Sequence, residues 1–579
     1  MVVTIIHDAT LNSKTNSERN DGSFSFNEFT LDEMPTGAKI IRISSDYPPP
    51  PIVVDQKLIS AAIWILSLIL VPMALTNALE GDFMLMGVLG GLSGLLFIFF
   101  VLKEGTCALP IIGLYFAGRL NFLPFGLTAP SIFTLGLVIY VFFEYFALKQ
   151  RNVSPGPPIL YIPILIITVI VGYHNRQVGL HALGSSAEGS RQGLMMMLGP
   201  LAYICGSSVF PPSVTFLSRI PWYCLLLGII TSIPNLLTSF FPGLAPYLYY
   251  LTDNVNLDAY RESLGYDTDI VRGGGFGSIG MYLELFLIAY YPIYSWWRPH
   301  RWWVSILFLI SFVGVIEGGF RSSMALYGFI FLVGTWCYCS WRSLFLLPVA
   351  CLVVFTVSVC AQSGLVDLPL SMQRSLSFLP GRWDAVVLES TAGSNDFRQN
   401  IEQVYKREYL YKSPWVGNGF LFDTREADML TDMSRYGDTG DHYFTAKAFI
   451  VSKTYHVGWI SLYDTVGLIG GIAFVALGVS MIWMSSRAVW GRIDYQAPLF
   501  PLKVWLLCNI TREFVGYFTV FGDIRNSFPA ACAYAIILIH LYRVERGMNL
   551  NPAAAPLPQP EAMQPPGKRM PQPSFLRPT

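Results

Sequence analysis

Residues 271–280 read VRGGGFGSIG, and this stretch separates two possible folds. Gly275, Gly277 and Gly280 satisfy G-x-G-x-x-G, the fingerprint of dinucleotide-binding folds. That fingerprint needs a preceding strand, a βαβ unit and an acidic residue about 20 positions later. Here an Asp-rich polar loop precedes the glycines, an apolar segment at 277–297 follows, and histidine stands near the acidic position. The stretch therefore predicts the start of a membrane helix.

The composition of the whole chain supports a membrane fold. Of 579 residues, 53% are hydrophobic and only 13% are charged, whereas soluble domains carry about 25% charge. The formal net charge is zero, so no basic field favours a nucleic-acid partner. The cysteines lie in apolar stretches without a C-x-x-C pair, which favours packing over metal or disulfide chemistry. We expect an all-α, polytopic integral membrane protein surrounded by membrane lipids.

A transmembrane helix needs about 20 mostly apolar residues, and the chain offers about fourteen such segments. They lie near 57–79, 82–102, 105–119, 129–149, 158–173, 193–214, 221–241, 277–297, 302–318, 321–340, 341–362, 457–486, 497–518 and 526–543. With a cytoplasmic N-terminus, the short inner connections are basic and the outer ones are longer and mixed in charge. This pattern predicts both chain ends on the cytoplasmic side.

The expected domain organisation follows from these spans. It comprises a disordered cytoplasmic tail at 1–56, helices at 57–362, a large outer loop at 363–456, helices at 457–545, and a Pro-rich cytoplasmic tail at 546–579. The outer loop is too long to be a simple connection. Within it, we expect a helix at 395–410 and a turn at 412–420.

Arg272 stands beside the glycine-rich stretch at a membrane surface. The first amides of a helix are unpaired and attract anions, and a neighbouring guanidinium adds a full positive charge. This combination favours an anion site. The alternative is a flexible hinge with an arginine near the lipid headgroups.

Arg321 and His456 each begin an apolar span at the outer surface. Positive charge is unusual on that side, so a phosphate partner would explain Arg321, although snorkelling to lipid phosphate is the alternative. His456 could accept a proton or orient a hydroxyl, and it could also be a plain interfacial residue. It lies too far from His442 for a helical metal pair, and we expect neither a metal site nor a cofactor.

Arg382 and Trp383, in PGRWDA at 380–385, are candidate sugar contacts because a ring can stack on a sugar while a guanidinium binds its hydroxyls. His442 is a further candidate in the same loop. Loop packing is the alternative for these residues, and the sequence favours it for Arg382 and Trp383.

The order of these pieces resembles the O-antigen ligase and O-antigen polymerase superfamily. Many spans lead to an Arg-Gly loop, and an arginine opens a later span in IEGGFRSSMALYG at 316–328. A long outer loop then carries PWVGNG at 414–419, and HVGWISLYDTVGLIG at 456–470 opens the next span. The resemblance covers roughly residues 270–475.

This resemblance implies a GT-C-like, metal-independent glycosyltransferase of the bacterial inner membrane with its active site facing the periplasm. The donor would be a glycan on undecaprenyl diphosphate, and the acceptor lipid A–core or another glycan. Arg272 and Arg321 would bind the diphosphate, and His456 would orient or deprotonate the acceptor. A polysaccharide polymerase of the same superfamily is one alternative, and a transporter or flippase of lipid-linked sugars is another. A scaffold without catalysis would leave these arginines unimportant.

Overall fold

The structure is a computed structural model, and the regular elements of its described residues are all helices, with no strand among them. The described residues are 103–115, 129–147, 156–175, 190–209, 211–249, 252–265, 270–296, 298–339, 352, 355–356, 359–360, 363, 367–420, 424–436, 442–455, 457–491, 494–520 and 522–550. The all-α prediction is therefore confirmed for this part of the chain. The predicted N-terminal tail, 1–56, lies outside the described residues. So does the predicted C-terminal tail, 546–579, except for its first five residues, because the last helix continues to Leu550.

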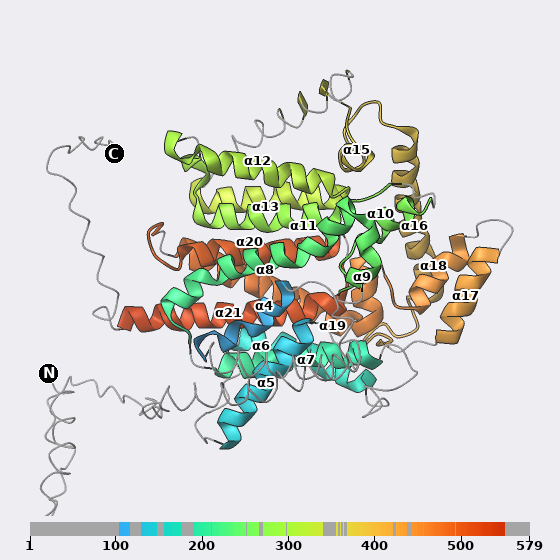
Figure 1. Cartoon of the computed structure of the whole chain (residues 1–579). Helices are drawn as coiled ribbons and strands as arrows, with labels where there is room; N and C mark the ends of the chain where they lie inside the picture. Colours follow the sequence, from blue (N-terminus) through green and yellow to red (C-terminus); the bar gives the residue numbers. More distant parts are fainter. Residues whose placement is uncertain are drawn as a thin grey trace, which may run out of the picture. The chain divides into compact units, whose positions relative to one another are not determined.

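The α-helices follow one another in chain order (Figure 1). Before the large loop they are α4 (Leu109–Tyr115), α5 (Ala129–Ala147), α6 (Pro158–Asn175), α7 (Ser190–Ser208), α8 (Val214–Phe240), α9 (Ala245–Tyr249), α10 (Leu257–Ser263), α11 (Gly274–Tyr290), α12 (Trp302–Glu317) and α13 (Arg321–Cys339). The loop and the region after it contain α15 (Leu370–Leu376), α16 (Ala385–Glu408), α17 (Thr424–Tyr436), α18 (His442–Val451), α19 (Gly458–Trp490), α20 (Phe500–Thr519) and α21 (Ile524–Leu550). Short 3-10 helices lie at Lys103–Ala108, Pro242–Leu244, Ile293–Ser295 and Pro299–Arg301.

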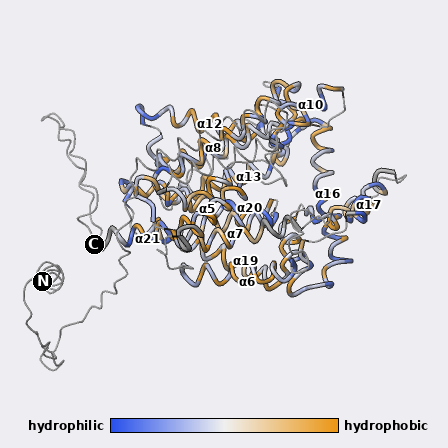
Figure 2. The backbone as a smooth tube through the Cα atoms, turned by 60° about the horizontal axis from the view of Figure 1, so that its bottom comes forward, coloured by the Kyte–Doolittle hydropathy of each residue, from blue (hydrophilic) through white to orange (hydrophobic). Residues whose placement is uncertain are grey.

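Five of these helical segments are long and apolar enough to cross a membrane: Pro158–Asn175, Val214–Phe240, Pro299–Glu317, Gly458–Trp490 and Ile524–Gly547. Shorter apolar helices lie at Gly105–Tyr115, Pro130–Phe142 and Gly274–Tyr290. Figure 2 shows hydrophobic residues along α6, α7 and α19. These helices indicate a membrane-embedded protein.

The predicted count of spans stays a prediction. The segments 57–79 and 82–102 lie outside the described residues, and so does most of 341–362. Each of the other predicted spans overlaps an α-helix.

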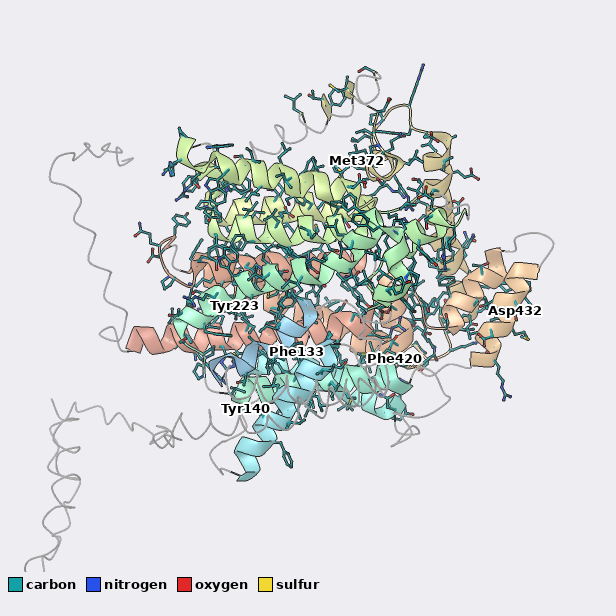
Figure 3. All side chains as sticks on the ribbon, in the orientation of Figure 1. Phe133, Tyr140, Tyr223, Met372, Phe420 and Asp432 are labelled. Carbon is teal, nitrogen blue, oxygen red and sulfur yellow. The ribbon has the colours of Figure 1, made fainter. Side chains whose placement is uncertain are left out.

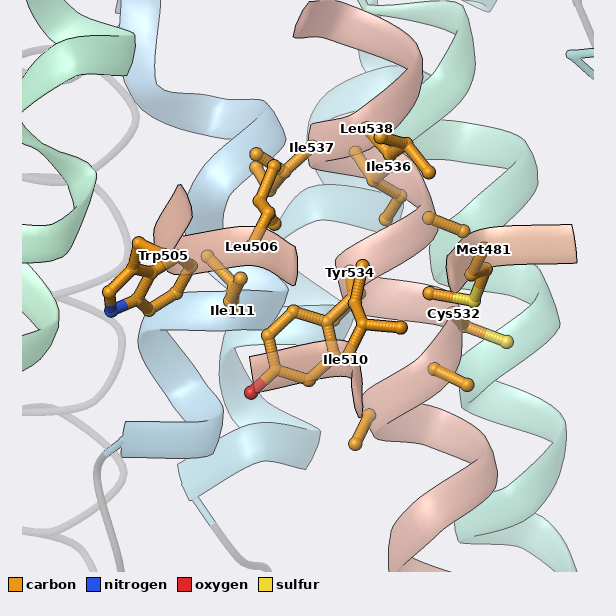
Figure 4. Packing of buried hydrophobic residues seen from close by; sticks show 14 of the residues in the cluster. Ile111, Met481, Trp505, Leu506, Ile510, Cys532, Tyr534, Ile536, Ile537 and Leu538 are labelled. Carbon is orange, nitrogen blue, oxygen red and sulfur yellow. The ribbon is translucent and has the colours of Figure 1, made fainter. Parts of the chain in front are cut away.

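The helices pack around a large hydrophobic core (Figure 4). Trp505 of α20 and Tyr534 of α21 are among its buried aromatic residues, and Cys532 lies in the same cluster near Met481. The cysteines whose side chains are described are free, and all of these but Cys360 are buried. The buried ones serve as small apolar packing residues, as the sequence predicts.

The large loop folds into α15, α16, α17 and α18, which lie at one end of the long helices (Figure 1). Figure 3 marks α15 by Met372 and α17 by Asp432. A separate hydrophobic cluster ties α16 and α18 to the start of α19 through Ile401, Tyr405, Ile450 and Ile460. The loop is thus packed on the membrane helices by buried apolar side chains.

The predicted loop helix at 395–410 begins ten residues too late, because α16 starts at Ala385. Asp384 caps it by accepting a hydrogen bond from the Val386 amide at 2.9 Å. Thr391, Gly393 and Ser394 have low helix propensity, so the sequence around them does not indicate that the helix already begins at Ala385. The predicted turn at 412–420 is confirmed.

Candidate functional site

Arg272 lies immediately before α11, where Gly273 is the N-cap. Its backbone carbonyl accepts a hydrogen bond from Asn256 Nδ2 at 3.0 Å. Its guanidinium carbon lies 5.2 Å from the centre of the Phe320 ring, which is a cation–π distance. Within the described residues, the buried Nε atom of Arg272 has no hydrogen-bond partner. The side chain is thus held by the ring and retains an unused donor.

Arg321 is the first residue of α13 and follows a tight connection from α12. Gly319 in this connection has φ +74°, a backbone conformation that residues with a side chain rarely adopt. A Cβ atom there would also lie 3.4 Å from Arg272 Cγ. The turn therefore brings the α13 start against the Arg272 side chain. Arg321 Nη2 donates a hydrogen bond to Asn395 Oδ1 of α16 at 3.3 Å.

Both predicted arginines line one cavity of about 1510 Å³. Its walls come from the Arg272 loop, the start of α13, α15, α16 and the end of α20. The described lining contains four arginines, Arg272, Arg321, Arg374 and Arg398, and one carboxylate, Glu389, a formal net charge of +3. Such a surface suits an anion with several oxygens, because guanidinium groups bind phosphate through paired N–H donors.

Arg374 is supplied by the short helix α15 and is only 7% exposed. Ser375 beside it donates a hydrogen bond to the Ile316 carbonyl at 2.7 Å. Leu376 packs with Ile316 and Met324 in a small hydrophobic cluster. These contacts fix α15 against α12 and α13, so Arg374 is presented to the cavity from a rigid support.

The glycines at the start of α11 contact neighbouring helices. The Gly275 amide donates to Asn235 Oδ1 of α8 at 2.7 Å. A Cβ at Gly277 would lie 3.3 Å from Gly318 Cα, and one at Gly280 would lie 2.5 Å from the Ser311 carbonyl oxygen. These glycines therefore allow α11 to pack closely on α8 and α12. The element described before this stretch is the helix α10, and no strand occurs among the described residues, which agrees with rejecting a dinucleotide-binding loop.

The turn PWVGNG at 414–419 is joined to a break in α19. Gly467 interrupts that helix with φ +67° and ψ −169°. Four backbone hydrogen bonds connect the two segments: Asn418 N to Asp464 O at 2.5 Å, Gly419 N to Thr465 O at 3.2 Å, Leu468 N to Pro414 O at 2.8 Å, and Ile469 N to Trp415 O at 3.1 Å. The two segments that carry the family resemblance are thus in direct contact.

Asp464 is buried at this junction and accepts several side-chain hydrogen bonds. Lys453 Nζ forms an ion pair with it at 2.6 Å, Asn418 Nδ2 donates at 2.7 Å, and Tyr405 donates at 3.2 Å. Tyr455 also donates to this carboxylate. Burial, together with the charge of Asp464, raises the pKa of Tyr455 well above its usual value. The hydroxyl therefore stays a proton donor, and Tyr455 is fixed directly before position 456.

Arg382 and Trp383 are not among the described residues that line the cavity. Arg382 is exposed. Trp383 packs in the small cluster beside α15 and donates from Nε1 to the Leu379 carbonyl at 3.0 Å, which agrees with the packing alternative. His442 begins α18, and its side chain lies outside the described part, as does His456.

Arg374 and Arg398 are the arginines of the described cavity lining that the sequence did not indicate. Both lie in a polar loop, where arginines are common, so neither stands out in the way that an arginine at the outer end of a membrane span does. The spacing of Glu389, Gly393 and Phe397 places them on one helical face beside Arg398, but only once the helix is known to begin at Ala385. Among the described residues, no group of three or more His, Cys, Asp or Glu side chains is arranged to hold a metal ion.

Compared with known proteins, the sequence matches no protein-family model and shows no significant similarity to a curated protein.

Proposed function

We propose that the chain is an O-antigen ligase-like glycosyltransferase of the bacterial inner membrane. It moves a glycan from undecaprenyl diphosphate to lipid A–core or another glycan acceptor at the periplasmic face. The proposal rests on the resemblance described above and on one observation. Arg272 and Arg321, singled out from separate motifs, line the same cavity.

The chemistry of the transfer gives these arginines a role. The acceptor hydroxyl oxygen attacks the anomeric carbon of the glycan, and the bond from that carbon to the diphosphate oxygen breaks. The bonding electron pair leaves with the diphosphate, which gains negative charge. Guanidinium groups placed around the leaving group stabilise this charge, more strongly in the transition state than before it. The cavity with its net charge of +3 supplies them.

The acceptor hydroxyl must also lose its proton during the transfer. His456 is the proposed acceptor of this proton, or the group that orients the hydroxyl. Its neighbour Tyr455 is held by Asp464. A base must be positioned within hydrogen-bond distance of its substrate. The fixed position of Tyr455 supports the role of His456 because it restricts the backbone directly before that residue.

The test uses purified full-length protein with undecaprenyl-diphosphate-linked glycan and either lipid A–core or a second lipid-linked glycan as acceptor. Wild type should transfer glycan, also in the presence of a metal chelator. Arg272→Ala and Arg321→Ala should each reduce the rate by roughly 100-fold, the loss typical of one stabilising donor. His456→Ala should lose transfer as well. Arg425→Ala is the matched control because this exposed arginine of α17 lies outside the cavity lining.

Full activity in the Arg321 or His456 variant would contradict the assignment. Product on lipid A–core would identify a ligase, and product on a growing chain would identify a polymerase. A transporter or flippase would yield neither product and would move the lipid-linked glycan across a proteoliposome membrane. Loss of transfer with chelator, restored by divalent ions, would contradict metal independence.

A further inference from the structure

The inner face of α16 forms one wall of the cavity and carries small polar side chains. Glu389, Ser390, Ser394 and Asn395 line the cavity together with Gly393. Residues three and four positions apart share one face of a helix, so these side chains form a continuous strip. The strip combines a carboxylate, hydroxyls and an amide, which both donate and accept hydrogen bonds.

The cavity is open beside this strip. Apart from its chain neighbours and the nearby backbone of its own helix, a Cβ atom added at Gly393 would meet no heavy atom of the described residues within 4 Å. Phe397 adds an aromatic ring one turn further along the same face. Polar groups that fix orientation and an aromatic surface for C–H groups are the usual lining of a site for a polyhydroxylated ligand.

The strip adjoins the arginine cluster directly. Asn395 Oδ1 accepts a hydrogen bond from Arg321 Nη2, and Arg398 follows one turn later on the same wall. A ligand whose phosphate lies at Arg321 would therefore present its attached sugar to α16. Trp383 and Arg382 lie elsewhere in the loop.

We propose that the inner face of α16 is the glycan subsite, which binds the hydroxyl groups of the sugar next to the diphosphate. This proposal rests on the proposed function, because it assumes a donor whose diphosphate lies at Arg272 and Arg321. It assigns recognition of the sugar to Glu389, Ser390 and Ser394, and recognition of the phosphate to the arginines.

The experiment measures the Kd of the full-length detergent-solubilised protein for two probes. One is undecaprenyl diphosphate, and the other is undecaprenyl diphosphate carrying one N-acetylhexosamine. Wild type should bind the sugar-bearing lipid at least about fivefold more tightly, which is the value of one good neutral hydrogen bond. Gly393→Leu, which fills the open space, and Ser394→Ala should abolish this preference without changing the Kd for the bare lipid.

Gln399→Leu is the matched control for Gly393→Leu, since Gln399 is an exposed residue of α16 outside the lining. It should leave both Kd values unchanged. Arg272→Ala should raise the Kd for both probes by a similar factor. Equal binding of the two probes by wild type, or a sugar preference that survives in Gly393→Leu and Ser394→Ala, would overturn the subsite. Wild type that binds neither lipid would instead overturn the proposed function.

Discussion

Glu408, the last residue of α16, connects this helix to α18. It accepts hydrogen bonds from Arg407 at 2.8 Å and from Tyr443 at 2.7 Å, and Lys447 Nζ lies 3.7 Å from its other oxygen. The bond from Arg407, followed by that from Tyr443, holds the pKa of Glu408 below its usual value near 4.5. Since Tyr443 and Lys447 belong to α18, the charged carboxylate stabilises the contact between the two helices.

This contact should depend on pH. Because the folded-state pKa of Glu408 is depressed, its stabilisation is present above about pH 4.5 and is lost as pH falls through the folded pKa. Glu408→Gln should therefore lower the stability by roughly 1 kcal/mol or less at pH 7, with a smaller difference at pH 3.5. Thermal unfolding at both pH values measures this. Glu402→Gln, which affects only a pair within α16, is the control. A Glu408→Gln effect that grows at low pH would contradict the assignment.

The arginines differ in how far sequence could predict them. Arg272 and Arg321 could be found because each stands at the predicted outer end of an apolar span, where positive charge is disfavoured. Arg374 could not, because its burial depends on the packing of α15 against Ile316 and Met324. Arg398 could not because its face of α16 is defined only once the helix is known to begin at Ala385.

At the scale of the element, the break in α19 can be tested directly. Gly467 has φ +67°, and a Cβ there would lie 2.4 Å from the Trp415 backbone. Gly467→Ala should thus destabilise the protein by at least about 2 kcal/mol, through backbone strain and a clash with the 414–419 turn. Differential scanning fluorimetry of the purified protein measures the change in Tm.

Gly471→Ala is the matched control for this substitution. Gly471 lies in the same helix, and its added Cβ would meet only Leu462 side-chain atoms at 3.6 Å or more. Its Tm should stay near that of wild type or rise slightly, because alanine favours the helix. Equal Tm values for both variants would refute the role of Gly467. The glycines of the 414–419 turn and Gly467 are visible in the sequence. That four backbone hydrogen bonds join the two segments could be seen only in the structure.

At the scale of the whole molecule, the positive-inside pattern predicts that the large loop lies outside the cytoplasm. Tyr411, in that loop, is 83% exposed, and His300, in a predicted inner connection, is also exposed. In intact cells, a membrane-impermeant maleimide should label Tyr411→Cys above the wild-type background. It should label His300→Cys only after permeabilisation. The reverse result would overturn the predicted orientation.

The membrane helices were predictable where apolar residues run without interruption. Others contain charges that mask their apolar character, and the structure shows how those of α20 are paired. Lys503 of α20 forms an ion pair with Glu545 of α21, and Arg512 pairs with its neighbour Glu513 at 2.5 Å. Pairing lowers the cost of placing a charge among apolar helices, but partners on different helices leave no local pattern in the sequence.

The close approach of Gly277 and Gly318 has a mechanical consequence. The two backbones touch without intervening side chains, so α11 and α12 cannot slide past one another without losing that contact. Arg272 precedes α11, and Arg321 follows α12 after a short turn. The contact between these two helices therefore fixes the distance between the two arginines. Since α15 is also fixed against α12 and α13, adaptation to ligands of different size must then occur on the wall formed by α16. Variation of specificity between related chains should therefore map to that helix.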